Sequence, residues 1–167
     1  MGSQYNPEEY SPILREFAGY KLVIQACSPR TVSEYMLDLR AFFKYIISKK
    51  SKIPYGTPAY EDISVKDVDL AMISSVATSD IYDFLLFCEK EFGNASAARA
   101  RKLSAIKGLY KFYTKTKMLL EKNPAEIVET PSKIGIPAES IFLEKSNKRG
   151  KFSPEYEHCI SGSEIFD

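Results

Sequence analysis

Residues 94–117 constrain the fold of this chain more than any other stretch, because they combine a strong helical period with an uninterrupted run of cations. Their apolar side chains recur at the spacing of one face of an α-helix. These are Leu103, Ile106, Leu109, Tyr110, Phe112 and Tyr113. The opposite arc carries Arg101, Ser104, Lys107, Gly108, Lys111 and Lys115, with Arg99, Lys102 and Lys117 at its edges. No Asp or Glu interrupts the stretch, so the sequence predicts one amphipathic helix with a wholly cationic outer face.

A cationic face of this kind indicates an anionic partner. Solvated helix faces normally mix both signs of charge, because opposite charges at i,i+4 attract and like charges repel. A polyphosphate backbone is the commonest partner that balances an unmixed cationic face. Ser104 and Gly108 favour DNA, because small residues would let the helix backbone approach a groove floor while the long cations reach the phosphates. A merely lysine-rich solvated face is the alternative for this stretch taken alone.

A second helix of the same design is predicted for residues 29–50. Ser28 and Pro29 are the preferred pair for an N-cap and a first helical position. The broad apolar face consists of Val32, Tyr35, Met36, Leu39, Phe42, Phe43, Ile46 and Ile47. Small polar residues and cations share the opposite face, which carries Arg30, Ser33, Arg40, Lys44 and Ser48. Two such faces are harder to explain as independent solvated surfaces than one.

Two more helices are expected from their apolar stripes. The first runs over residues 7–26, and another runs over residues 79–92. Thr78-Ser-Asp is a capping signal before the latter helix, and Gly93 is a suitable residue to end it. The sequence therefore predicts four main helices.

Shorter segments connect these helices. Residues 51–62 are expected to form a loop, because they contain two prolines and a glycine. Residues 65–76 are expected to hold short helical or irregular structure. After the cationic helix, residues 123–131 are predicted to fold back on the bundle through Ile127 and Val128.

Composition supports one globular domain with extensions. The 167 residues are 44% hydrophobic and 13% aromatic, which is enough for a sizeable core and excludes a disordered chain. The net charge is only +1, but the charge is segregated. Residues 60–92 are strongly acidic, whereas the helix that follows is wholly cationic. This segregation gives the molecule one basic side, which matters more for an anionic partner than the total charge.

The remaining composition argues against metal, membrane and secretory classes. Cys27, Cys88 and Cys159 are odd in number and widely spaced, so neither a structural disulfide nor a zinc site is expected. His158 is the single histidine, which leaves no closed set of metal ligands, and no cofactor is expected. No apolar run reaches the about 20 residues of a membrane span. The start lacks a secretory signal, so a reducing cytoplasm is the predicted location.

Several motifs together resemble a known family. SPRTVSEYMLDLRAFFKYI, SDIYDFLLFCEKEF and RKLSAIKGLYKFY, followed by NPA, are similar to the N-terminal core-binding domain of tyrosine recombinases. That family contains the phage integrases and the Xer-type chromosome-dimer resolvases. The resemblance covers roughly residues 10–133. It implies an all-α fold, a four-helix SAM-like orthogonal bundle with short extra helices, whose second and fourth helices cross in the major groove as half of a clamp around DNA.

The residues expected to contact DNA lie on those two helices. They are Arg30, Thr31, Ser33, Arg40, Lys44, Arg99, Arg101, Lys102, Ser104, Lys107, Lys111 and Lys115. The partner implied is double-stranded DNA, with other recombinase protomers joining on the DNA. We expect the free chain to be a monomer, without membrane contact.

The family's catalytic pattern is absent from the sequence. That pattern includes several arginines, a lysine, an H-x-x-R pair and a nucleophilic tyrosine, whereas His158 has no arginine three residues on. We therefore expect no catalytic residues and no enzyme activity from this chain alone. The expected organisation is an N-terminal extension (1–9), a helical DNA-binding domain (10–129), and a linker with a weakly ordered C-terminal tail (130–167). A stand-alone helical accessory or protein-interaction domain, without DNA cleavage, is the alternative function.

Overall fold

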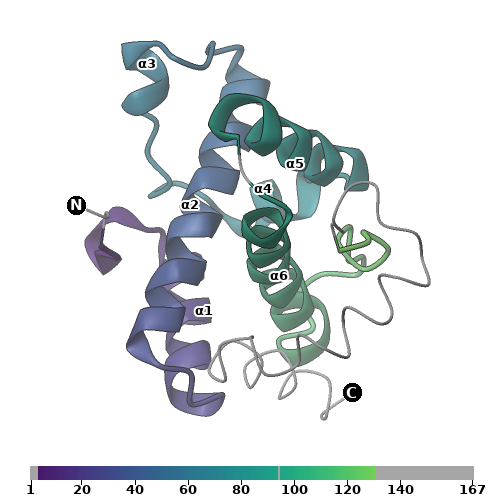
Figure 1. Ribbon diagram of the computed structural model, residues 1–167. Helices are drawn as coiled ribbons and strands as arrows, with labels where there is room; N and C mark the ends of the chain where they lie inside the picture. The colour runs from purple at the N-terminus through teal and green to yellow at the C-terminus, as the bar shows by residue number, and fades with distance from the viewer. Residues whose placement is uncertain (1–3, 94, 131–167) are drawn as a thin grey trace.

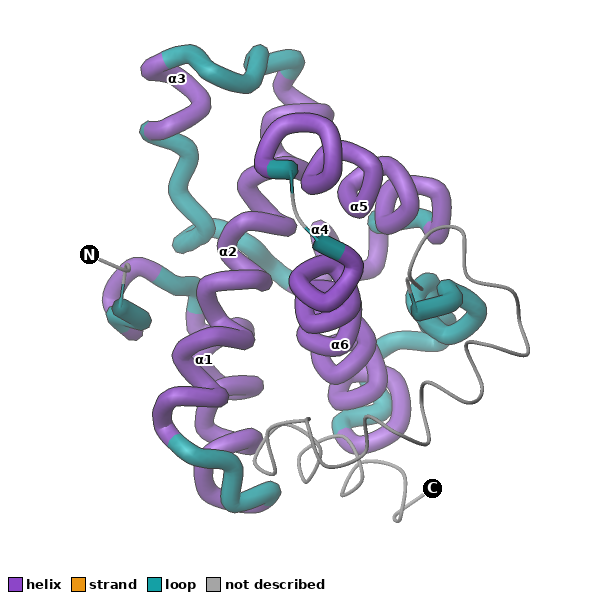
Figure 2. The backbone as a smooth tube through the Cα atoms, viewed as in Figure 1, coloured by secondary structure: helices purple, strands orange, loops and turns teal. Residues whose placement is uncertain are grey.

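The chain is built from helices and turns (Figure 1). The computed structural model describes residues 4–93 and 95–130. In chain order the elements are η1 (Pro7–Glu9), α1 (Pro12–Gly19), η2 (Tyr20–Ile24), α2 (Pro29–Ser51), α3 (Pro58–Glu61), α4 (Leu70–Ser75), α5 (Thr78–Phe92), α6 (Ser96–Lys111) and η3 (Phe112–Thr116). Within those ranges there is no strand, only an isolated bridge between Tyr10 and Val65 (Figure 2). The predicted all-α class with four main helices is confirmed.

Helix α6 is the central element of the bundle. Figure 1 shows α6 in the middle of the molecule, with α1 and α2 on one side, and α6 contacts both α2 and α5. All six residues of its predicted apolar arc are 0–4% exposed. The Tyr110 hydroxyl, buried among them, donates a hydrogen bond to the Ile73 carbonyl oxygen at 2.7 Å. The periodicity therefore identified the buried face correctly. The expected single helix over residues 94–117 is wrong at its C-terminal end, because α6 ends at Lys111 and the π-helical turn η3 holds Phe112 and Tyr113.

Helix α2 also forms as its local sequence predicts. The Ser28 hydroxyl accepts the backbone N–H of Thr31 at 3.1 Å, and Pro29 occupies the first turn. The helix ends at Lys52, which adopts a left-handed conformation with φ of 58°. Its predicted apolar face is buried, except that Ile47 is half-buried.

The prediction of one continuous first helix over residues 7–26 is wrong. The structure divides it into the 3-10 turn η1, helix α1 and the π-helical turn η2. The break occurs because Ser11 caps α1 by accepting the Leu14 N–H, and Pro12 begins the helix. Tyr10 stays extended, and its hydroxyl donates to the Met36 carbonyl oxygen at 3.0 Å. Ser11-Pro12 is the same helix-start signal as Ser28-Pro29. It was overlooked in the sequence because the apolar stripe continues across it.

Helix α5 matches its predicted range, but its cap differs. Ala77 is the N-cap residue, and the Asp80 carboxylate accepts the Ala77 N–H at 2.9 Å. Thr78 instead donates its hydroxyl to the Pro124 carbonyl oxygen at 2.7 Å. Gly93 ends the helix with φ of 60°, the left-handed conformation that glycine adopts without strain.

The connecting segments were predicted in part. The segment over residues 65–76 contains α4, and the expected loop contains the short helix α3. The return after α6 packs through Val128, 1% exposed, but Ile127 is 73% exposed, so the prediction for Ile127 is wrong. Ala125, fully buried, takes that place because the turn geometry aims residues three apart at the bundle. The expected tail over residues 131–167 lies outside the described residues.

Removing the buried side chain of Leu103 should test the orientation of α6. Leu103 is 1% exposed, and deleting a buried leucine leaves a cavity that the surrounding side chains fill only partly. We expect Leu103→Ala to lower the free energy of unfolding by about 2–5 kcal/mol, measured by chemical denaturation. Leu86 on α5 is 64% exposed, so Leu86→Ala serves as a control and should change it by less than about 0.5 kcal/mol. A loss below about 1 kcal/mol for Leu103→Ala would contradict the packing described here.

Candidate nucleic-acid interface

Asp38 joins the two cationic helices. Its side chain is 3% exposed on α2 and accepts two hydrogen bonds from Arg101 of α6, from Nε at 2.9 Å and from Nη2 at 3.1 Å. Lys102 Nζ donates to the same carboxylate at 2.9 Å. One buried anion therefore holds two cations, and the cluster keeps a net positive charge at the crossing of α2 and α6. Sequence periodicity placed Asp38 on neither face, so this contact was not predicted.

The start of α2 contributes one freely exposed cation. The Arg30 side chain is 86% exposed and lies 3.7 Å from the Glu34 carboxylate. Thr31 is only 4% exposed, and its hydroxyl accepts a hydrogen bond from the Ser28 hydroxyl at 3.0 Å, so it belongs to the helix cap. The Ser33 hydroxyl accepts the backbone N–H of Tyr5 at 3.2 Å. The N-terminal segment thus lies against this part of the predicted DNA surface.

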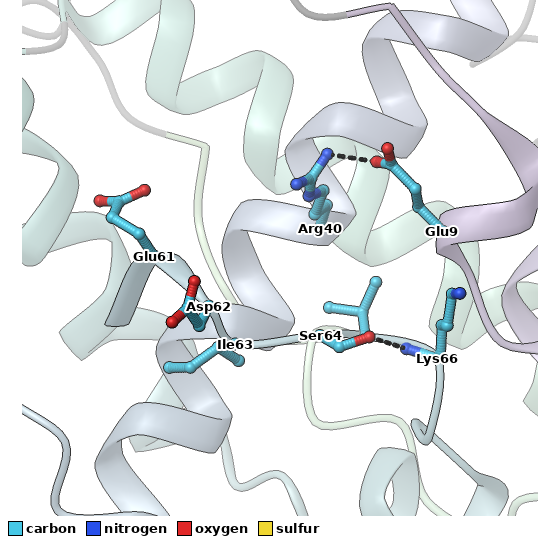
Figure 3. A pocket seen from close by; sticks show the side chains of 8 residues that line it. Glu9, Arg40, Glu61, Asp62, Ile63, Ser64 and Lys66 are labelled. Atoms are coloured by element: carbon cyan, nitrogen blue, oxygen red, sulfur yellow. Dashed lines mark hydrogen bonds and ion pairs between the residues drawn. The ribbon is translucent and has the colours of Figure 1, made fainter. Parts of the chain in front are cut away.

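Two further cations of α2 are held by carboxylates from outside the helix. Arg40 donates to Glu9 of η1 at 2.7 Å, beside a pocket of about 190 Å³ that these residues line with Lys66 (Figure 3). Lys44 is 12% exposed, donates to the Glu61 carbonyl oxygen at 3.2 Å and lies 3.8 Å from the Glu61 carboxylate. The carboxylates of both pairs are exposed, at 45% for Glu9 and 71% for Glu61, and ion pairs that water reaches contribute about 1 kcal/mol or less. An incoming phosphate could therefore compete with both carboxylates.

The first turn of α6 carries a cation with a structural role. Arg99 is 8% exposed and lies 3.2 Å from the Glu89 carboxylate of α5. This arrangement packs α6 against the end of α5. Arg99 therefore lies at the start of the cationic arc, but its side chain packs against α5.

The second half of α6 carries positive charge toward solvent. Ser104, Lys107 and Lys111 are half-buried on one stripe of the helix, and Lys115 follows in η3 with an exposed side chain. Among the described residues no carboxylate forms an ion pair with Lys107. The predicted cationic arc thus exists on both helices, and on α2 the charges of Arg40 and Lys44 are compensated by carboxylates from other elements.

Gly108 does not serve the purpose that the sequence suggested. We expected it to let the helix backbone approach a DNA groove. A Cβ at this position would lie 3.3 Å from Phe17 Cζ and 3.6 Å from both Cε and Nζ of Lys21. Gly108 therefore allows α6 to pack closely against α1 and η2.

Lys21 is the cation that sequence analysis missed. It is 4% exposed on the π-helical turn η2, and its ammonium lies 5.6 Å from the ring centre of Phe17 and 5.5 Å from that of Tyr35. Burial, with a smaller contribution from the charge of Lys111, lowers the pKa of Lys21 to about 8. Its position next to residues of an apolar stripe was the only signal available in the sequence.

The cysteines differ from expectation. Cys27 is disulfide-bonded, so the prediction that none of the cysteines forms a disulfide is wrong. Spacing along the sequence could not reveal this, because pairing depends on distance in the folded chain. Cys88 is a buried free thiol, and burial raises its pKa to about 11.

Other ligand classes receive no support from the described part of the chain. Within it, no group of three or more His, Cys, Asp and Glu side chains lies close enough to hold a metal ion. In the same ranges, no helix is both long enough and apolar enough to cross a bilayer. His158 lies outside the described residues.

Comparison with known proteins finds relatives that share most of the length of this chain. The tyrosine recombinase XerC of Caldanaerobacter subterraneus subsp. tengcongensis is 33% identical over 140 residues, which cover 84% of this chain and 39% of that protein. XerC of Myxococcus xanthus is 28% identical over 139 residues, covering 79% of this chain and 38% of that protein. Over the matched residues the chain is homologous to part of these XerC proteins. It spans about two fifths of the length of these relatives.

The XerC homology agrees with the resemblance found in the sequence motifs. The matched share of each relative has the size of a single domain. No family model matches the chain. No solved structure matches it significantly either, so the fold described above comes from this chain's own structure.

Removing the Asp38 carboxylate should loosen the joint between α2 and α6. Breaking a buried ion pair leaves uncompensated cations, so we expect Asp38→Ala to lower the free energy of unfolding by about 3 kcal/mol. The control is Glu34→Ala, which removes the exposed Arg30 pair and should change it by less than about 0.5 kcal/mol. Urea denaturation of both variants measures the difference. Equal effects of the two substitutions would show that Asp38 does not hold the helices together.

Proposed function

We propose that this chain is a DNA-binding module of a site-specific tyrosine recombinase, which grips double-stranded DNA through α2 and α6. The observation that carries the proposal is the joint at Asp38, which orients two cationic helices together in a homologue of XerC. The long cations of both helices suit the phosphate backbone, which supplies most of the affinity of such proteins. The described part of the chain contains no rival metal site.

The residues proposed to contact DNA are the twelve expected from the sequence, with different weights. Lys107, Lys111, Lys115 and Arg30 are accessible enough to meet phosphates directly. Arg40 and Lys44 would exchange Glu9 and Glu61 for phosphates. Arg101 and Lys102 would contribute through the net charge of their cluster with Asp38. Thr31 and Arg99 are buried and would support the helix ends that carry the other contacts.

The proposed organisation follows the sequence boundaries. Residues 10–129 form the DNA-binding unit, preceded by the extension over residues 1–9, and residues 130–167 serve as a linker and tail. A single module is half of a clamp, so we expect weak binding, with a Kd of about 10⁻⁴ to 10⁻⁶ M at physiological salt. Other recombinase protomers would join on the DNA. The chain itself would not cleave it.

A charge reversal on α6 tests DNA binding. We expect Lys107→Glu/Lys111→Glu to abolish binding to a short labelled duplex at physiological salt, because two phosphate contacts become repulsive. Any binding that remains at low salt should have a salt slope flatter by about two units. The matched control is Lys90→Glu/Lys122→Glu, which makes the same change of net charge at exposed lysines outside α2 and α6. Fluorescence anisotropy at several salt concentrations measures both quantities. Circular dichroism checks that each variant folds.

Equal affinity and equal salt slope for wild type and Lys107→Glu/Lys111→Glu would contradict the proposal. Loss of binding in both double variants would show that only net charge matters. A chain that does not bind DNA would instead fit the alternative, a helical accessory domain that binds protein.

The absence of catalysis has a separate test. Phosphoryl transfer requires preorganised cations around the developing charge, and this sequence lacks the H-x-x-R pair that supplies part of them. We expect no covalent complex when the chain is incubated with a nicked suicide substrate and analysed on a denaturing gel. A trapped 3′-phosphotyrosyl adduct would overturn this expectation.

A further inference from the structure

Lys21 is a buried cation without a carboxylate. It is 4% exposed, and among the described residues no Asp or Glu forms an ion pair with it. Its Cε and Nζ lie beside Gly108 of α6, and its ammonium also faces the rings of Phe17 and Tyr35. Contact with an aromatic face compensates a cation only in part, by about 2 kcal/mol or less in most sites. Burial of this charge is therefore unfavourable for the folded protein.

The surroundings of Lys21 increase this cost. The titratable groups that face it are Tyr35 of α2 and Lys111 of α6, and Lys111 repels its positive charge. Lys107 lies one turn before Lys111 on the same helix, so both lysines belong to the α6 stripe next to Gly108. Packing alone would be served better by an apolar residue of similar volume.

The position suits an anion that approaches from solvent. Within the described ranges Lys21 Nζ makes no hydrogen bond, so its N–H donors remain available to an acceptor. Because Gly108 has no side chain, Lys21 lies directly against the α6 backbone, beside the cationic stripe of that helix. A site partly screened from water strengthens each charge-assisted hydrogen bond made within it.

We propose that Lys21 forms, together with Lys107 and Lys111, a binding site for one phosphate of the DNA backbone where η2 packs against α6. This inference rests on the proposed function, and it adds a phosphate contact from outside the two helices already assigned. The phosphate supplies the negative charge that the protein does not place beside Lys21. Lys21 would thus be a DNA-contacting residue rather than a core residue.

The site makes DNA binding sensitive to pH. In the free protein the pKa of Lys21 is about 8, so its charge is present below that pH and is lost above it. A bound phosphate favours the charged form and raises the pKa, so binding above about pH 8 requires the uptake of a proton. Affinity should therefore fall as the pH rises through this range.

The experiment compares wild type with Lys21→Met and Lys21→Arg in the full chain. Methionine preserves the volume of the stem without the charge, whereas arginine keeps its charge at every pH tested. Binding to the labelled duplex is measured by anisotropy at about pH 7 and about pH 9, on either side of the lowered pKa. Thermal unfolding of the same variants is recorded in parallel.

We expect Lys21→Met to bind about tenfold more weakly at about pH 7, with a salt slope flatter by about one unit. Wild type should lose about fivefold in affinity between about pH 7 and pH 9, whereas both variants should change little. Lys21→Met should also melt about 3 °C or more above wild type, because a buried charge has been removed. A residue with a purely structural role would not produce weaker binding together with higher stability.

Two results would overturn the inference. One is Lys21→Met binding with the affinity and pH dependence of wild type, while Lys107→Glu/Lys111→Glu has lost binding; this outcome leaves the proposed function intact. The other is equal pH dependence in wild type and Lys21→Arg. Unaltered binding by Lys107→Glu/Lys111→Glu would instead contradict the proposed function itself, and the phosphate site with it.

Discussion

The contact of Asp38 with Arg101 and Lys102 fixes how the two main helices are presented. Apolar faces bring α2 and α6 together, but the hydrophobic effect has no direction and would tolerate small rotations or slides. A bidentate contact between a guanidinium and a carboxylate has a defined geometry, so it sets the register of one helix against the other. The cationic arcs of both helices are consequently held in one relative orientation, which a partner with a regular spacing of phosphates can recognise.

The distribution of compensating carboxylates explains how a chain with a net charge of +1 can still carry a basic surface. On α2, Arg40 and Lys44 are balanced by Glu9 and Glu61, which lie on η1 and α3 rather than on the helix itself. These acidic residues are at least 45% exposed, so their pairs are weak and exchangeable. Binding of DNA at α2 would then be an exchange of one anion for another, while on α6 Lys107 forms no ion pair with any described carboxylate.

The sequence predicted what depends on the period of a single helix. Residues 29–50 gave the correct helix, and residues 94–117 gave the correct buried face, because core residues such as Leu103 recur at helical spacing. The change from α6 to the π-helical turn η3 after Lys111 was not predicted. Prediction from the sequence failed for residues whose environment is set by contacts with other elements of the fold. Gly108 has its role from Phe17 and Lys21, and Ile127 is exposed because a turn, not a period, sets its direction. Ion pairs between elements, such as Arg40 with Glu9, could not be predicted from either element alone.

A comparison within the chain strengthens the interpretation of Lys21. Arg99 is almost as buried as Lys21, and there the fold supplies the Glu89 carboxylate at 3.2 Å. Lys102, 13% exposed, likewise receives the Asp38 carboxylate. The protein therefore pairs its buried cations where their role is to join helices. At Lys21 it instead places a second cation, Lys111, nearby and offers only ring faces. A buried charge left without an anion by its own protein, at the edge of a cationic helix face, is most simply explained by an anion that arrives with the partner.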